Sequence, residues 1–339
     1  MRLGLLRSLT TSKMIIGDLL GKGKAGDVST RDGMDSVSLL RRAAAPRVLL
    51  DAAVVAHGSA RLTREEIAVQ RRLRDPLAEG WNPIGHATLR SSDDQTVAAV
   101  TALRAAIARA DVPSSAYDGW GVLAAPRFLG RSKLVVVLDR FKAEGVWGVT
   151  PHLIPHFALH AQAGTLSLVL GGHGPNLGIG GGLYSASEGV LSALTWLASG
   201  VAPGVWLVLT GWSPEYQPDL NGEPRAVTHC EALALALTPT SDDCASPIKL
   251  RIVEAETARP PFPPTPEVLT ARLESFVAPS VASPRLIGHE VHGGRGYPRP
   301  HLPGEPRRDG RFATIGTDAS GRLLIELAAP RTSPLGETS

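Results

Sequence analysis

The side chains best suited to attack a carbonyl carbon lie in one glycine-rich stretch, residues 174–189, near the middle of the 339-residue chain. Ser185 and Ser187 stand there, directly before an apolar run at helical spacing that ends at Gly200. A second apolar run, residues 205–210, follows almost at once. The glycine-rich stretch begins as a short apolar strand and turns into the helix, so that strand, turn, helix and second strand form a βαβ unit. The turn of such a unit is the usual place for an exposed nucleophile or for a bound anion. The stretch therefore predicts the geometry of an active site.

Neither serine completes the sequence pattern of a nucleophile elbow. Residues 187–189 match the end of that pattern, but Ser185, not glycine, stands two residues before Ser187. Ser185 therefore has two interpretations, as the cap of the following helix or as a weak candidate nucleophile. The predicted reactive group of this turn is not evident from the residues alone.

The sequence predicts no cofactor and no metal ion. The glycine-rich turn is followed neither by Lys-Ser/Thr, as in a phosphate loop, nor by an acid at ribose distance. Three histidines recur at every fourth residue, namely His152, His156 and His160. Pro155 prevents a continuous helix through them, and no acidic or cysteine partner lies nearby. Cys230 and Cys244 are expected to be free thiols in a reducing cytoplasm.

Composition is that of a globular protein, with 43% hydrophobic and 20% charged residues, enough for one large core or two modest ones. The net charge of +3 is small, and no Lys/Arg-rich run is interleaved with aromatic residues, so no nucleic-acid partner is expected. No apolar run reaches the length of a membrane span. We therefore expect a soluble, cytoplasmic protein.

Periodicity predicts an alternation of strands and helices, and hence a parallel sheet with helical crossovers. The expected strands are residues 47–56, 119–125, 205–210, 228–237 and 248–253, the last paired with the one before it, and the expected helices are 63–73, 93–111, 158–170, 185–199 and 266–277. Residues 134–138 are apolar and β-branched. Residues 312–315 and 323–327 predict a terminal hairpin.

The motifs around the glycine-rich stretch resemble the N-terminal half of a β-ketoacyl synthase of the thiolase fold. They are Pro151-His152-Leu153-Ile154-Pro155, Ala163-Gly164 and Gly171-Gly172-His173-Gly174-Pro175, followed by the strand, the helix and Gly200. The resemblance implies an α/β, thiolase-like half fold with a mixed, mostly parallel sheet and helices on both faces. It divides the chain into a disordered or peripheral leader (1–45), a synthase-like domain (46–255) and a Pro-rich linker with an irregular C-terminal extension (256–339).

The resemblance also implies that the catalytic set of the family is missing. In that family the residue nine positions after the glycine of the Gly-Pro pair is the catalytic cysteine, and here that position is Leu183. The two histidines of the family's second half have no counterpart after residue 254. We therefore expect a catalytically degenerate protein, and whether it is an enzyme at all is left open.

Its expected role is that of a non-condensing, chain-length-factor-like partner of an acyl-carrier-protein-dependent synthase in fatty-acid or polyketide-type biosynthesis. Two alternatives are an acyltransferase with a non-cysteine nucleophile such as Ser185, and a thiolase-fold scaffold without an acyl ligand. A homodimer or a heterodimer with a catalytic ketosynthase is expected, through the interface residues Gly178, Gly180, Gly182, Tyr184 and His160. An acidic acyl carrier protein is a further candidate partner, for the basic cluster Arg127, Arg131, Lys133, Arg140 and Lys142.

The helix at 185–199 should need this partner. In half a fold its apolar residues Leu191, Leu194, Trp196 and Leu197 are expected to face water in a monomer. The helix at 266–277 is expected to cover only part of that surface.

Overall fold

The computed structural model describes residues 47–72, 86–110, 114–150, 157–215, 228–240, 248–255, 257, 259–277 and 312–329. All of them belong to the second of the two units into which the chain divides, residues 45–339. The expected leader, Cys244, His152 and His156 lie outside the described residues.

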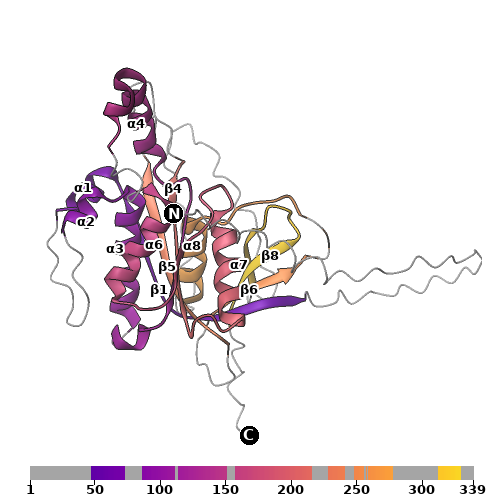
Figure 1. Ribbon diagram of the computed structural model, residues 1–339. Coiled ribbons are helices and arrows are strands. Elements are labelled where there is room, and N and C mark those ends of the chain that lie inside the picture. Colours follow the sequence, from indigo (N-terminus) through magenta and orange to yellow (C-terminus); the bar gives the residue numbers. More distant parts are fainter. Residues whose placement is uncertain are drawn as a thin grey trace, which may run out of the picture. The chain divides into compact units, whose positions relative to one another are not determined.

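An eight-stranded mixed sheet organises this unit, in the order β3-β2-β4-β5-β1-β6-β8-β7. Figure 1 shows α3 and α6 on one side of this sheet and α7 on the other. The strands are β1 (Val48–Leu62), β2 (Gly121–Pro126), β3 (Asn176–Gly178), β4 (Val205–Ser213), β5 (His229–Thr238), β6 (Lys249–Glu254), β7 (Phe312–Thr317) and β8 (Leu323–Ala328). Only β3, β2 and β4 pair in parallel; every other described pair of neighbours is antiparallel. The predicted α/β class and the mixed sheet are confirmed. The expectation that the sheet is mostly parallel is wrong, because β5, β1, β6, β8 and β7 all pair with their neighbours in the antiparallel sense.

Helices cover both faces of the sheet, as predicted. They are α1 (Arg64–Gln70), α2 (His86–Ser91), α3 (Asp94–Ala110), α4 (Arg131–Glu144), α6 (Leu159–Leu170), α7 (Ser185–Ala198) and α8 (Pro266–Val277), with 3-10 turns η1 (Ser114–Tyr117) and η2 (Gly145–Gly148). Side chains of β4 alternate between the two layers. Trp206 and Val208 pack with α3 and α6, whereas Leu207 and Leu209 pack with α7 and α8. A strand buried on both faces explains the continuous apolar run at 205–210.

The long strand β1 corrects one predicted pairing. Residues 53–62 of β1 pair with β5, and residues 48–53 pair with β6, with register shifts at Val48/Leu50 and Val54/Ala56. The strand at 248–253 was expected to pair with the strand before it, and this is wrong because β1 lies between them. A 15-residue strand is long enough to join two partners along its length.

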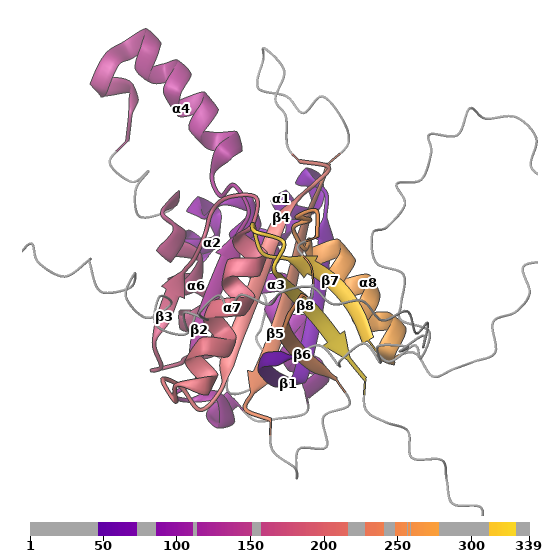
Figure 2. The ribbon, with the colours of Figure 1, turned by 90° about the vertical axis from the view of Figure 1, so that its right-hand side faces the viewer.

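The C-terminal region completes the core and corrects a second expectation. α8 places Leu269 and Leu273 fully in the interior, and the predicted hairpin, β7 and β8, extends the sheet beside β6 (Figure 2). Leu194 and Leu197 of α7 are buried in the same cluster. The expectation that the apolar face of this helix would be exposed in a monomer is therefore wrong, because the chain itself covers it. Leu191 alone of the four is strongly exposed.

The apolar, β-branched run at 134–138 lies in a helix, α4. Arg, Lys and Glu residues with good helix propensity flank the run, and the propensity cost of valine in a helix is small. None of the described side chains of α4 is buried.

Two glycines test the packing of α3 and α6. A methyl group at Gly58 on β1 would lie 2.2 Å from the backbone nitrogen of Ala106 and 2.5 Å from the carbonyl oxygen of Ala102, both on α3. Gly58→Ala is expected to lower the free energy of unfolding by about 2–3 kcal/mol, because the helix must move outward. Gly164→Ala on α6, where a methyl group meets nothing within 4 Å, should raise it by about 0.5–1 kcal/mol. Urea titrations of both variants measure these changes, and a neutral Gly58→Ala would contradict the packing.

Candidate functional site

The turn between β3 and α7 is held in place by the end of β2. The N–H of Ile179 donates to the carbonyl of Ala124 (2.8 Å), and the N–H of Phe128 donates to the carbonyl of Gly181 (3.1 Å). Gly180 and Gly181 have φ angles of 77° and 96°, in the left-handed region that favours glycine. The turn thus leaves the sheet in a fixed direction and delivers the chain to the start of α7.

Two glycines of this turn are required by packing within the chain. A methyl group at Gly180 would lie 2.7 Å from the Cα of Ser185, and one at Gly178 would lie 2.1 Å from the carbonyl oxygen of Leu159 on α6. Gly182 differs, because a methyl group there meets nothing within 4 Å and the residue is exposed. Substitutions of Gly180 would therefore disturb the fold before they reported on any interface.

Leu183 occupies the exposed position at the N-terminal end of α7. It is 40% exposed, and Tyr184, half-buried, takes the N-cap position without making a side-chain cap. The positive end of a 14-residue helix dipole lies beside this position. A thiol here would have a lowered pKa, whereas a leucine side chain has no proton to lose and no lone pair to donate.

The two serines are not available at this position. Ser185 is 1% exposed and is already the first residue of α7, so the interpretation of Ser185 as the helix cap is wrong by one residue. The Ser187 hydroxyl is buried and donates a hydrogen bond to the carbonyl of Thr317 on β7 (2.7 Å). Ser187 therefore fastens α7 to the C-terminal hairpin. Neither hydroxyl presents itself for attack on a substrate.

A buried network of side chains supports the turn from behind. Gln95 donates to the carbonyl of Arg127 (2.9 Å) and accepts from the Thr210 hydroxyl (2.8 Å), and Gln162 donates to that same hydroxyl (3.2 Å). These residues come from α3, from the segment after β2, from β4 and from α6. Arg127 in turn bridges to Gly181 in the turn. The ends of four elements are thereby fixed relative to one another by satisfied polar groups.

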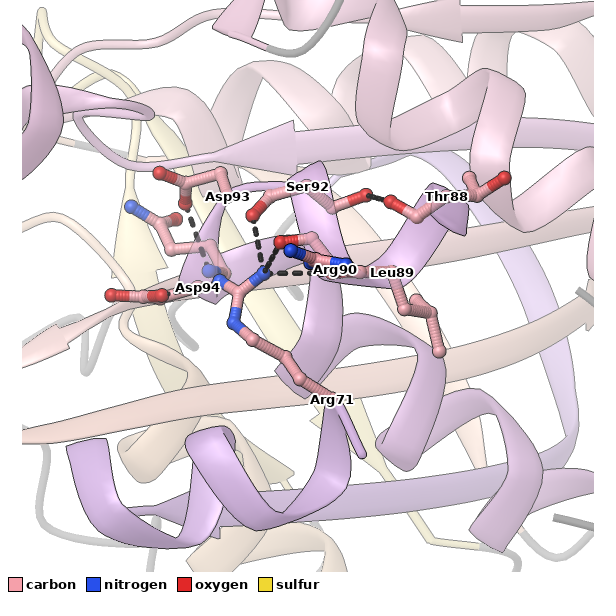
Figure 3. A network of polar contacts seen from close by, with 8 residues as sticks. Arg71, Thr88, Leu89, Arg90, Ser92, Asp93 and Asp94 are labelled. Carbon is pink, nitrogen blue, oxygen red and sulfur yellow. Dashed lines mark hydrogen bonds and ion pairs between the residues drawn. The ribbon is translucent and has the colours of Figure 1, made fainter. Parts of the chain in front are cut away.

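The start of α3 is fixed by Arg71 (Figure 3). Its guanidinium donates to the carbonyls of Leu89 (2.7 Å) and Ser92 (2.7 Å) and to the carboxylate of Asp94 (2.5 Å). Asp93 beside them is 2% exposed and accepts the N–H of Gln95 (2.8 Å). Burial, followed by the nearby charge of Asp94, raises the pKa of Asp93 to about 6.

Glu231 lies near the start of α8, on the other face of the sheet. It is 4% exposed on β5, and its carboxylate lies 3.6 Å from the guanidinium of Arg61 on β1. Burial raises the pKa of Glu231 to about 7, and the Glu267 carboxylate adds to that effect. Neither Glu231 nor the network around Thr210 was predicted from the sequence. The sequence signal that could have revealed Glu231 and Thr210 is a lone polar residue inside an otherwise apolar strand.

The predicted basic cluster is largely paired within the chain. The Glu215 carboxylate forms ion pairs with the guanidinium groups of both Arg127 (3.3 Å) and Arg131 (3.7 Å). The Lys142 ammonium lies 3.4 Å from the Asp139 carboxylate. Burial raises the pKa of Glu215, against the opposing effect of the two arginines. Among the described residues, Lys133 and Arg140 have no carboxylate partner, so part of the positive charge of the cluster remains open to an acidic protein.

The remaining predicted site residues are placed as follows. Tyr184 lines a cavity of about 210 Å³ between α7 and the C-terminal hairpin, together with Leu191, Ile252 and Leu323. His160 is exposed near the start of α6, whose backbone covers Gly178. In the part of the chain that the structure describes, no three His, Cys, Asp or Glu side chains are grouped as a metal site would require. Among the described helices, none has the length and apolar character needed to cross a membrane.

Solved structures similar to this chain are ketosynthases and their complexes. One is the ketosynthase ApeO in complex with its chain length factor ApeC from Xenorhabdus doucetiae, with 12% identity, a TM-score of 0.46 and coverage of 83% of this chain and 100% of that chain. A second is AntDE:AntF, a type II PKS acyl-carrier protein in complex with its ketosynthase bound to the hexaketide, with 14% identity, a TM-score of 0.41 and coverage of 67% of this chain and 73% of that chain. A third is a β-ketoacyl synthase from Burkholderia phymatum STM815, with 13% identity, a TM-score of 0.41 and coverage of 63% of this chain and 67% of that chain.

These neighbours are of the type that the sequence motifs resemble. No family model matches the chain, and no curated protein matches it. At identities of 12–14% and TM-scores below 0.5, the structural neighbours carry no argument about activity or partners.

The buried carboxylate of Asp93 predicts a pH dependence of stability. Its pKa is about 6 in the folded chain and about 3.9 when unfolded, so the folded state binds more protons between these values. Stability relative to Asp93→Asn should therefore fall by on the order of 2 kcal/mol as the pH rises from 4 to 7, and stay level above that. Asp94→Asn, which removes the carboxylate that Arg71 contacts, should instead be destabilising at pH 7. Urea titrations across this range check both, and parallel curves for wild type and Asp93→Asn would refute the assignment.

Proposed function

We propose that this chain is a ketosynthase-like subunit without condensing activity, which acts beside a catalytic ketosynthase in cytoplasmic fatty-acid or polyketide-type biosynthesis. One observation carries the proposal. The turn after β3 delivers an exposed side chain to the N-terminus of a long helix, and that side chain is Leu183. The position is the one at which the resembled family places its nucleophile.

Condensation needs a thiolate that accepts the acyl group, and groups that activate the second thioester. Leu183 supplies no thiolate, and Ser185 is buried against Gly180, where a substrate cannot reach its hydroxyl. Among the described residues after β6, only α8, β7 and β8 follow, and they complete the existing sheet rather than form a second βαβ half. The chain's own residues thus favour a non-condensing role over acyl transfer from Ser185.

The edge of the sheet favours a subunit of an assembly. β3 pairs with β2 on one side and forms the end of the strand order on the other, with Leu177 43% exposed. An open edge of this kind is a template for a strand of another chain, and it suits a two-fold axis. Exposed Gly182 and His160 flank it and are the predicted interface residues that a partner would reach. The partner is a second thiolase-fold subunit; direct binding of an acyl carrier protein to the cluster at 127–142 is not needed.

The wild-type protein is expected to gain no acyl group from acyl-CoA or acyl-carrier thioesters, because no exposed nucleophile stands at the turn. Intact-mass spectrometry measures this. Leu183→Cys is the matched control, and it should gain one acyl group but remain unable to condense it with a malonyl thioester. A stoichiometric adduct on the wild type that is lost in Ser185→Ala would replace this role by the acyltransferase alternative.

The partner is tested on the same preparations. Co-expression with a synthase encoded beside this gene, followed by size-exclusion chromatography with light scattering, should yield a complex that Leu177→Lys abolishes. Leu168→Lys, at an exposed position on α6, is the control and should leave the complex intact. Absence of any complex would leave the scaffold alternative.

A further inference from the structure

A cavity of about 360 Å³ lies between α8 and the paired ends of β1 and β5. Its volume is in the range of small-molecule sites. The α8 wall is one helix face, because Glu267, Thr270, Ala271 and Glu274 recur at i, i+3, i+4 and i+7. None of the residues that line the cavity belongs to the turn before α7. An inference from this cavity therefore goes beyond the proposed function and does not depend on it.

The strand wall of the cavity holds a buried carboxylate that lacks a hydrogen bond. Glu231 is 4% exposed, and among the described residues its Oε1 has no hydrogen-bond partner. The Nε of Arg61 lies 3.6 Å from this oxygen, which is too far for a hydrogen bond, and the Arg61 side chain is 59% exposed. A buried carboxylate oxygen without a hydrogen bond costs free energy, which a donor bound in the cavity would recover.

Negative charge prevails among the side chains that line the cavity. The carboxylates of Glu231, Glu267 and Glu274 stand against one guanidinium, that of Arg61. The Glu267 carboxylate accepts a hydrogen bond from the Ser213 hydroxyl (2.9 Å), which holds it at the same end of the cavity as Glu231. The cavity is therefore suited to a cation.

The other charged groups near these carboxylates do not reverse that balance. Burial, followed by the charge of Arg109, lowers the pKa of His57 against the opposing effect of Glu274, so His57 is neutral at pH 7. Glu231 and Glu267 also line a second cavity of about 130 Å³, where Arg127 and Glu215 form an ion pair with each other (3.3 Å).

The carboxylates are spread along α8 instead of surrounding one point. Glu267 and Glu274 are seven residues apart, which is about 10 Å along the helix axis. Between the two ends the cavity is lined by the methyl groups of Ala60, Ala232 and Ala271. Such a cavity matches a molecule with two positive ends and an apolar middle better than it matches a single metal ion.

We infer that this cavity binds a short linear aliphatic diamine, with one ammonium group between Glu231 and Glu267 and the other at Glu274. The first ammonium group donates to the free Oε1 of Glu231 and to the Glu267 carboxylate, since an ammonium has three donors. The methylene chain lies against the alanine side chains. The exposed Arg61 side chain is free to move into solvent when the ammonium group takes its place.

Isothermal titration calorimetry of the full-length protein with 1,6-diaminohexane tests the site. The diamine should bind with one molecule per chain and about threefold more tightly than hexylamine, because its second ammonium group gains the exposed Glu274 carboxylate. 1,6-Hexanediol, which has the same length and no charge, should not bind.

Three variants locate the binding. Glu274→Gln should remove the advantage of the diamine over hexylamine, and because Glu274 is exposed the fold should not change. Glu231→Gln should weaken both ligands by about tenfold or more, because the buried hydrogen bond to a charged acceptor is lost. Glu144→Gln, the same change at an exposed residue of α4, is the control and should leave both affinities as in the wild type. Melting temperatures show that each variant is folded.

Binding should also release protons. The pKa of Glu231 is about 7 in the free protein, through burial and the Glu267 carboxylate, and a bound ammonium group favours the ionised form. The affinity should therefore rise about tenfold from pH 6 to pH 8 and then level off, with about half a proton released at pH 7. Calorimetry in buffers of different ionisation enthalpy measures the release, which Glu231→Gln should abolish.

Three results would overturn the inference, and each would leave the proposed function intact. They are the absence of any heat of binding at millimolar 1,6-diaminohexane, equal binding of 1,6-hexanediol, and a folded Glu231→Gln variant that binds both amines as tightly as the wild type.

Discussion

The hydrogen bonds around Thr210 are the constraint on which the candidate site depends. A threonine in the middle of a buried sheet must find partners, and it finds the side-chain amides of Gln95 and Gln162. Gln95 then holds the carbonyl of Arg127, whose backbone bridges to Gly181. One buried hydroxyl thus links β4, α3 and α6 to the turn before α7. Loss of any member would leave a polar group unpaired in the interior, so the network fixes the turn more firmly than apolar packing alone.

This support is more elaborate than a leucine needs. A leucine at the end of a helix makes no demand on the direction of its side chain, whereas a reacting group must be held to within a fraction of an ångström. The chain keeps left-handed glycines, a close Gly180–Ser185 approach and a buried polar support at a position that holds Leu183. Under the proposed non-condensing role, this turn has the geometry of an active site without a reactive atom. A subunit that must match a catalytic partner in shape would have reason to keep such geometry.

Local patterns predicted the elements of the fold, whereas contacts between distant residues were not predictable from them. The helices expected at 63–73, 93–111 and 266–277 follow from patterns among neighbouring residues, and the structure confirms them as α1, α3 and α8. The partner of β6 depends on where β1 lies, which no local pattern records. The β-branched run at 134–138 gave no sign that this segment is a helix, α4. Ser185, interpreted as the helix cap, is the first residue of α7, a difference of one position that is within the usual uncertainty of a helix boundary. Gln95, Thr210 and Gln162 were each visible as polar residues in apolar segments, but Thr210 lies 115 residues from Gln95 and 48 residues from Gln162 in the sequence.

The most direct measurement of the central claim is the thiol pKa of the Leu183→Cys variant, from the pH dependence of its alkylation by iodoacetamide. If the turn aims this side chain at the positive end of α7, the pKa should lie clearly below the ordinary value of about 8.5. The Leu177→Cys variant, substituted at a similarly exposed position on β3 away from the helix end, should show the ordinary value. A thiol pKa in Leu183→Cys at or above that in Leu177→Cys, or a Leu183→Cys thiol that does not react in the folded protein, would contradict the account.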